Sequence, residues 1–310
     1  MKLGSEQHSR EYRVEAPPLR SALPVNAFFV IGVAVVFSLV SSCARLAYDS
    51  GSNALTIVAL RTPLVGIALW AYMRARGVSC RLPPSERNWA FVLGAVLAFS
   101  TLVLNKALAI IPVPIAILIF YTYPLLTSLV SWVTRTELFS WRVAAALVIA
   151  FCGIGLALQV KGGPLNAAGL AYSFAAAAGW GSLLYLSGRV FRGGDSRPRT
   201  LHMMFSGSLL VLLACAVTGD VAFPATQKGW IGFAGVPFIY GVAIIGHMAA
   251  VIAIGAMKTA FYMNFEPVTT ILFSALLLGQ FLTPIQLTGA GLVVAALLLF
   301  RMPAIKPDRV

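Results

Sequence analysis

The chain has 310 residues, of which 59% are hydrophobic and 11% charged, and its formal net charge is +13. A water-soluble domain of this size could not cover so much apolar surface, whereas a lipid bilayer requires no polar surface on the lipid-facing side. The basic residues lie in the gaps between apolar segments, as membrane topology requires, which argues against a nucleic-acid partner. The composition therefore predicts an integral membrane protein.

Residues 1–22 are polar and of mixed charge, without an apolar core and cleavage site, so we expect a disordered cytoplasmic tail. Residues 304–310 are expected to form a second cytoplasmic tail. The four cysteines are scattered, mostly within apolar segments, and none has the CxxC spacing of a metal or redox site. No phosphate-binding loop, dinucleotide motif or catalytic dyad is present. We therefore expect no cofactor, no metal and no enzymatic activity.

Segments of about 20 apolar residues are long enough to cross a bilayer as helices. Ten such segments follow one another, separated by short polar connections that leave no room for a soluble domain: 25–46, 53–73, 89–110, 114–134, 141–160, 166–188, 200–218, 233–256, 259–279 and 284–300. With the N-terminus inside, eighteen of the 23 Lys and Arg residues fall on the cytoplasmic side and two on the outside. This asymmetry predicts a plasma (inner) membrane protein with both termini in the cytoplasm.

Two stretches of the chain repeat each other without a gap at an offset of 143 residues: 121–157 and 264–300. The offset places Pro267 on Pro124 and Gln280 on Glu137. A repeat of this length indicates a duplicated unit, here 23–160 and 166–303. Five helices per unit is an odd number, so the second copy enters the membrane from the opposite side. The predicted fold is therefore all-α, with ten transmembrane helices in two inverted five-helix repeats, the design of many secondary transporters.

The sequence also resembles the EamA-type members of the drug/metabolite transporter superfamily. The matching residues are Pro124 followed by Glu137, Phe139 and Ser140, and the Glu266-Pro267 pair in the second copy. Gln280 departs from the pattern, since it replaces the second acidic residue. The resemblance implies ten helices in a five-plus-five arrangement and export of amino acids or other metabolites, as in the YddG-type amino-acid exporters. It implies no enzymatic activity.

Ionisable residues within membrane helices usually face the protein interior, so they are the first candidates for a site. Glu266 and His247 are expected at similar depths, about 10–14 Å from the cytoplasmic end by helical rise. They would share a proton or hold a substrate amino group; alternatively, Glu266 merely accepts hydrogen bonds from a neighbouring helix. Arg61 would bind a substrate carboxylate or pair with a carbonyl freed by Pro63. Lys106, beside Asn105, would contribute to the site or extend to the outer headgroups.

Aromatic residues recur in the segments that the repeat pairs, among them Tyr121, Tyr123, Trp180 and Tyr262. A cavity lined by such rings, with few charges, suits a moderately apolar organic solute, although aromatic residues also face lipid. Pro124 and Pro267 are expected to bend equivalent central helices and to act as hinges.

Three classes of function fit a helical membrane protein of this kind. The inverted repeats favour a secondary transporter, an exporter of small organic metabolites such as amino acids, that works by alternating access. The alternatives are a passive channel or lipid scramblase, and a membrane scaffold that transports nothing. The expected partners are a small-molecule substrate and the lipid bilayer, and a monomer is compatible with the sequence.

Overall fold

The computed structural model describes residues 26–159, 166–191, 193–278 and 282–300. The two predicted tails and Gln280 lie outside the described residues. The described part of the chain forms helices connected by short turns and loops: α1 (Ala27–Tyr48), α2 (Ala54–Ala75), α3 (Pro84–Ile110), α4 (Val113–Phe120), α5 (Tyr123–Val133), α6 (Trp141–Ala157), α7 (Ala167–Val190), α8 (Ser196–Thr218), α9 (Gln227–Ile254), α10 (Ala256–Tyr262), α11 (Phe265–Leu278) and α12 (Pro284–Leu299).

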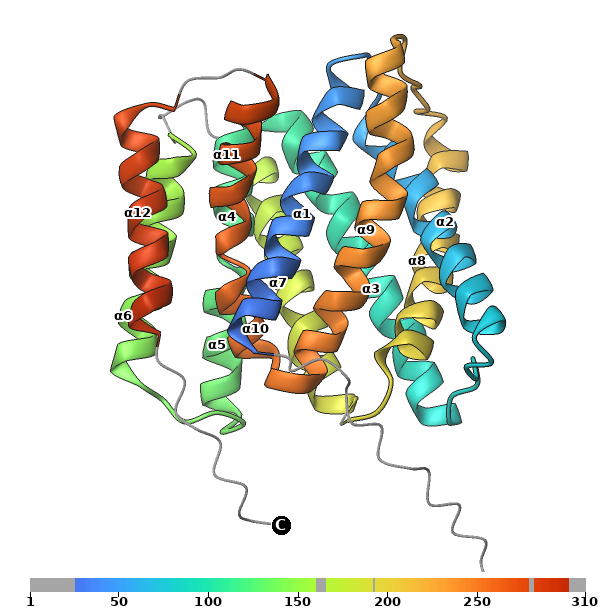
Figure 1. Cartoon of the computed structure of the whole chain (residues 1–310), viewed down its shortest axis with the longest axis horizontal. Coiled ribbons are helices and arrows are strands. Elements are labelled where there is room, and N and C mark those ends of the chain that lie inside the picture. Colours follow the sequence, from blue (N-terminus) through green and yellow to red (C-terminus); the bar gives the residue numbers. More distant parts are fainter. Residues whose placement is uncertain (1–25, 160–165, 192, 279–281, 301–310) are drawn as a thin grey trace, which may run out of the picture.

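These helices make ten crossings, because α4 with α5, and α10 with α11, each form one interrupted crossing. The crossings run side by side in one bundle, with α6 and α12 on one flank and α2 and α8 on the other (Figure 1). Helix α1 begins, and α12 ends, at the same end of the bundle (Figure 1). Most of the described Arg residues that lie in connections or near helix ends are at this end, so we call it the basic end. We call the other end the opposite end.

Seven of the helical segments in the described residues are long and apolar enough to cross a membrane, the α4–α5 unit among them, and α6 and α12 are shorter apolar helices. Large apolar side chains on the helices are exposed, for example Leu209 in α8 and Phe238 in α9. In water this surface would aggregate, whereas in a bilayer it contacts lipid. The predicted all-α membrane fold is confirmed.

The duplication extends over the whole bundle, because α1–α6 (repeat 1) recur in order as α7–α12 (repeat 2). Helices α3, α4 and α6 begin at residues 84, 113 and 141, and α9, α10 and α12 begin at 227, 256 and 284. Each pair differs by 143 residues. The packing is exchanged in the same way: α1 lies against α9, and the equivalent α7 lies against α3. Each repeat thus packs its first helix on the third helix of the other.

Close backbone contacts between the repeats depend on glycine. A Cβ at Gly94 in α3 would overlap the carbonyl group of Met203 in α8, and a Cβ at Gly289 in α12 would overlap the backbone of Ala157 in α6. Without side chains at these positions the helices approach closely enough for dispersion contacts to replace the hydrophobic effect, which is absent between helices in lipid.

At the opposite end, hydrogen bonds join the α1–α2 connection to the α8–α9 connection. Ser52 Oγ donates to the carbonyl oxygen of Ala222 (2.8 Å), Asn53 Nδ2 donates to Asp220 Oδ1 (2.8 Å), and the backbone N–H of Ala225 donates to the carbonyl oxygen of Ser50 (2.7 Å). At the basic end, Arg199 at the start of α8 is buried and donates to Glu86 in α3 (2.9 Å). Polar interactions therefore connect the two repeats at both ends of the bundle.

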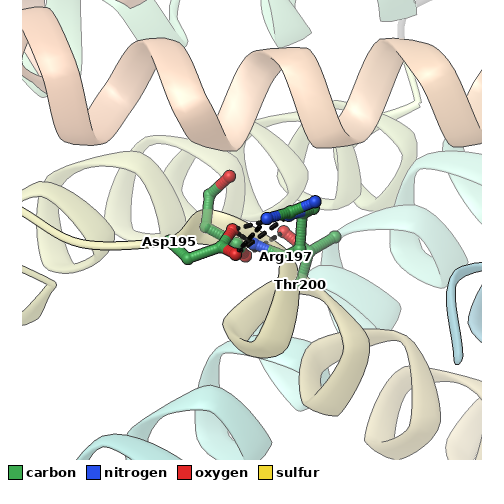
Figure 2. Close-up of polar contacts among 4 residues, drawn as sticks. Asp195, Arg197 and Thr200 are labelled. Atoms are coloured by element: carbon green, nitrogen blue, oxygen red, sulfur yellow. Dashed lines mark hydrogen bonds and ion pairs between the residues drawn. The ribbon is translucent and has the colours of Figure 1, made fainter. Parts of the chain in front are cut away.

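The turn that leads into α8 contains its own ion pair (Figure 2). The Arg197 guanidinium faces the Asp195 carboxylate at 2.6 Å, while Thr200 donates to the carbonyl oxygen of Ser196. Asp195 also accepts from the backbone N–H of Arg197 and so caps the helix. Burial alone raises the pKa of Asp195, but the hydrogen bonds from Arg197 outweigh it and leave that pKa below its ordinary value. The carboxylate therefore stays ionised at neutral pH and holds the start of α8.

Candidate functional site

The two interrupted crossings are the structural feature from which the candidate site is built. Helix α4 ends at Phe120 and α5 begins at Tyr123, while α10 ends at Tyr262 and α11 begins at Phe265. Proline has no N–H with which to bond the carbonyl four residues earlier. Pro124 therefore leaves the carbonyl of Phe120 without its helical donor, and Pro267 does the same to Met263. The interruption lies just before each proline, so the predicted hinge falls on residues 121–122 and 263–264.

Glu266 lies in the first turn of α11, directly after the second interruption. A carboxylate at this position is favoured by the partial positive charge of a helix N-terminus. Tyr121 and Tyr123, at the first interruption, lie near this carboxylate, and of the two only the Tyr121 hydroxyl is close enough to interact with it directly. The two interruptions therefore meet, and their meeting point carries one carboxylate and two phenols. The sequence analysis named all three residues as candidates but did not predict that they lie together.

Aromatic rings extend from this point toward the centre of the bundle. The ring centroids of Tyr123 and Trp180 are 6.4 Å apart, those of Trp180 and His247 are 6.0 Å apart, and those of His247 and Phe37 are 5.6 Å apart. Phe120 lies beside the same tryptophan at 6.1 Å. The rings meet edge to face or nearly so, which is a favourable arrangement of their quadrupoles.

Equivalent residues of the two repeats meet in this row. Phe37 and Trp180 differ by 143 positions, and both contact the imidazole of His247. Tyr123 and Glu266 also differ by 143 positions and are neighbours. Two residues related by a twofold axis lie close together only where they are near that axis. The candidate site therefore lies on the interface between the repeats, near the pseudo-twofold axis.

The row continues from Phe37 to Tyr240 in α9, at 5.9 Å between centroids, and ends at Arg61 in α2. The guanidinium carbon of Arg61 lies 4.1 Å from the centre of the Tyr240 ring, a cation–π contact. Helix α2 continues through Pro63, and Arg61 Nε has no hydrogen-bond partner among the described residues. The Nε atom of Arg61 therefore does not pair with a carbonyl freed by Pro63.

Other predicted contacts are not formed. His247 is fully buried, and neither ring nitrogen has a hydrogen-bond partner within the described ranges, so it shares no proton with Glu266. The His247 ring contacts Trp180 and Phe37 instead, because similar depth in the membrane does not fix lateral position. Tyr262 contacts Phe261 and Phe300 instead of the ring row.

The side chains of Asn105 and Lys106, which were expected at one site, point in different directions. Lys106 is exposed, whereas the side-chain nitrogen of Asn105 is buried without a partner in the described part of the chain. Neighbours in a helix point about 100° apart, so the two side chains leave α3 on different faces. Lys106 is thus placed to extend toward the headgroups at the opposite end, and the structure does not bring it to the ring row.

The sequence interpretation missed Phe37 and Phe120 as members of the row. The repeat contained the signal for Phe37, because the offset of 143 residues places it on Trp180. Phe120 was recognisable only from its place next to Tyr121, where the interruption turns the chain.

Comparison with protein-family models decides what this bundle is. The model of the EamA-like transporter family matches twice, at residues 25–159 and 167–302. The chain belongs to the EamA-like transporter family. It is therefore a multi-pass membrane protein of a family of transporters rather than of enzymes, and the resemblance stated from Pro124 and Glu266-Pro267 is confirmed.

Known relatives agree with this assignment. The threonine/homoserine exporter RhtA of Escherichia coli (strain K12) is 27% identical over 247 residues, which cover 77% of this chain and 79% of the relative. RhtA of Escherichia coli O157:H7 gives the same values. A solved crystal structure, described only as that of a protein, has a TM-score of 0.73 at 18% identity and covers 88% of this chain and 95% of the other. This last likeness concerns the fold alone.

Proposed function

We propose that the protein is a secondary transporter that exports small amino acids or similar amines by alternating access, with the substrate bound where the two interruptions meet. The observation that carries the proposal is the meeting of Glu266 with Tyr121 and Tyr123 on the interface between the repeats. Alternating access exchanges the conformations of two inverted repeats, so a site on their interface is reached from either side in turn. The relatives whose name states export of threonine and homoserine support an amino-acid substrate.

The chemistry of the site fits an ammonium group. A carboxylate inside a membrane protein is costly unless it holds a proton or a cationic partner, and Glu266 has no basic side chain among its hydrogen-bond or ion-pair partners in the described residues. A substrate ammonium would supply the missing charge. The same ammonium would contact the faces of the Tyr123 and Trp180 rings. The apolar part of the substrate would pack along the edges of these rings. Tyr121 and Tyr123 would orient it through their hydroxyl groups.

We propose further that the basic end faces the cytoplasm, since positively charged connections are retained on that side. Cysteines introduced at Ser85 and Arg197, at the basic end, should then react only with reagents that enter the cell. A cysteine at Gln227, at the opposite end, should react with an impermeant reagent added outside. Reaction of either of the first two with the impermeant reagent in intact cells would reject this orientation.

The function is tested by counterflow in proteoliposomes loaded with unlabelled threonine or homoserine and given the labelled amino acid outside. A carrier shows saturable uptake that is accelerated by internal substrate. A channel or scramblase shows flux without this acceleration, and a scaffold shows no flux. Either of the last two results would reject the proposal.

The role of Glu266 is tested in the same vesicles with Glu266→Gln, which keeps the shape of the side chain and removes its charge. If Glu266 holds the substrate amine, the exchange rate and the substrate affinity of the variant should each fall by at least about tenfold. A tenfold loss of affinity corresponds to about 1.4 kcal/mol of binding free energy. If it carries a coupled proton, exchange persists and uptake driven by a pH gradient is lost. Glu137→Gln is the matched control, because repeat 2 has Gln280 at that position. Normal exchange and normal pH-driven uptake in Glu266→Gln would exclude both roles.

A further inference from the structure

Arg61 is a second charged group inside the bundle, and its surroundings differ from those of Glu266. It lies seven residues into α2, about 10 Å below the opposite end by helical rise. Its guanidinium carbon lies over the Tyr240 ring at 4.1 Å, and its Nε is buried with no hydrogen-bond partner in the described part of the chain. The residue as a whole is only partly buried, but this N–H donor is shielded from solvent and unused.

No acidic side chain of the described residues pairs with this arginine. The ion pairs there join Arg45 to Asp49, Arg197 to Asp195 and Arg199 to Glu86. The Tyr240 ring offsets part of the cost of placing a cation at this depth, but a ring quadrupole does not replace a counter-charge. Buried cations are ordinarily paired or bound to a ligand. Arg61, which is partly buried, has no acidic partner among the described residues and is therefore available to bind an anion.

A small cavity lies at this guanidinium. It is lined by Arg61 and Thr62 of α2, Thr101 of α3, Gly207 of α8 and Tyr240 of α9, with apolar neighbours, and has room for about one water molecule. The Thr62 hydroxyl donates to the carbonyl oxygen of Val58, and the Thr101 hydroxyl to that of Leu97. Because the hydroxyl protons are engaged within their helices, the guanidinium supplies the available donors. A space of this size accepts a monatomic anion or one oxygen atom of a carboxylate group that approaches the guanidinium, rather than a whole metabolite.

We propose that Arg61 and the cavity beside it form an anion subsite, distinct from the Glu266 site, that binds a single carboxylate group or a chloride ion. The rings of Tyr240, Phe37, His247 and Trp180 lie between Arg61 and the Tyr123–Glu266 pair, so one α-amino acid does not span both charges in this conformation. With a substrate carboxylate as occupant, the subsite is a stage on the path toward the opposite end and rests on the proposed function. With chloride as occupant, it does not depend on that function.

The subsite is tested on the purified, substrate-free protein by thermal unfolding in sodium acetate, sodium chloride or sodium sulfate at equal ionic strength. A ligand that binds only the folded state raises the apparent Tm, here by about 2–4 °C for acetate or chloride. Arg61→Gln should lose this increase. Arg45→Gln should keep it, because Arg45 is exposed and pairs with Asp49, and this control cancels general effects of each salt.

The two possible occupants, a carboxylate group and a chloride ion, are distinguished by which anion raises the Tm. An increase with acetate alone identifies a carboxylate site, whereas an equal or larger increase with chloride identifies an inorganic anion site. If Arg61→Gln does not fold, Arg61→Lys serves instead, and it should retain less than half of the increase because lysine lacks the planar fork. Equal shifts in wild type and the Arg61 variant, or no shift in wild type, would overturn the subsite. Counterflow of amino acids is measured separately, so failure of the transport proposal would not be confused with this result.

Discussion

Helices α4 and α10 are equivalent in the repeat, yet they are packed differently. All seven residues of α10, at the basic end, are buried, and the helix lies against α5, α7 and α9. In α4, at the opposite end, only Ile115 and Ala116 are buried. The helix pairs equivalent to α10–α5 and α10–α7 are α4–α11 and α4–α1, and neither makes comparable contact.

The difference shows that one sequence unit has taken two conformations within a single structure. In repeat 2 the first half of the interrupted crossing is wholly buried against α5, α7 and α9, whereas in repeat 1 it lies mainly against α7 and is only partly buried. Alternating access requires this kind of asymmetry, since the two repeats exchange conformations when access changes sides. Under the proposed mechanism, the structure represents the state in which the basic end is closed. The predictions below separate a real conformational difference from one that follows only from unlike side chains.

The largest effect is expected from overpacking α10. Ala260 is fully buried, so Ala260→Phe should oppose the packed position of α10 by about 1–3 kcal/mol. That energy shifts the equilibrium away from the closed basic end by about 5- to 150-fold. The variant should have a lower Tm and an altered rate of counterflow. Ile117→Phe is the control at the equivalent position of α4, which is only partly buried and should tolerate the larger ring. Equal losses in both variants would show that the two helices do not differ in packing.

A smaller effect is expected from the prolines. Pro124→Ala allows a backbone hydrogen bond to the carbonyl of Phe120, and Pro267→Ala allows one to the carbonyl of Met263. Each bond contributes about 1 kcal/mol, which corresponds to about a fivefold change in an equilibrium or rate constant. Both variants should express and fold normally, while turnover in counterflow falls by about that factor and substrate affinity changes less. Pro63→Ala is the control, since α2 continues through Pro63 and is not interrupted there. Turnover at the wild-type level in both hinge variants would remove the hinge from the mechanism.

Much of the fold could be predicted because a bilayer imposes strong rules. The apolar length of each crossing and the 143-residue offset were enough for the ten crossings and the inverted repeats. The expected start of α9 was late, at residue 233 instead of Gln227, because Lys228 and Trp230 interrupt the apolar pattern within a helix that already extends to the opposite end. Hydropathy locates the apolar part of a helix, and hydrogen bonding by Thr226 sets its actual start.

The candidate site was less predictable, since depth along a helix says nothing about which way a side chain points. Glu266 and His247 were expected at similar depths, but the imidazole of His247 packs on Trp180 and makes no hydrogen bond within the described residues. Tyr262 is four residues from Glu266 and still contacts Phe300, because the interruption at residues 263–264 changes the helical phase. The cation–π contact of Arg61 with Tyr240 joins residues 179 positions apart and has no signal in either local sequence. Only the repeat symmetry relates residues that are far apart in the sequence, as the equivalence of Phe37 and Trp180 shows.

Reciprocal labelling during transport tests the central claim most directly. Single cysteines at Ile117 in α4 and at Ala260 in α10 are introduced into a protein whose four native cysteines are replaced by alanine or serine. Without substrate, the cysteine at Ile117 should react readily from the opposite side, and the buried cysteine at Ala260 should not react. During exchange with saturating substrate, reactivity at Ala260 from the basic side should rise while reactivity at Ile117 falls. Reactivities that rise together, or that do not change while exchange proceeds, would contradict alternating access through these two helices.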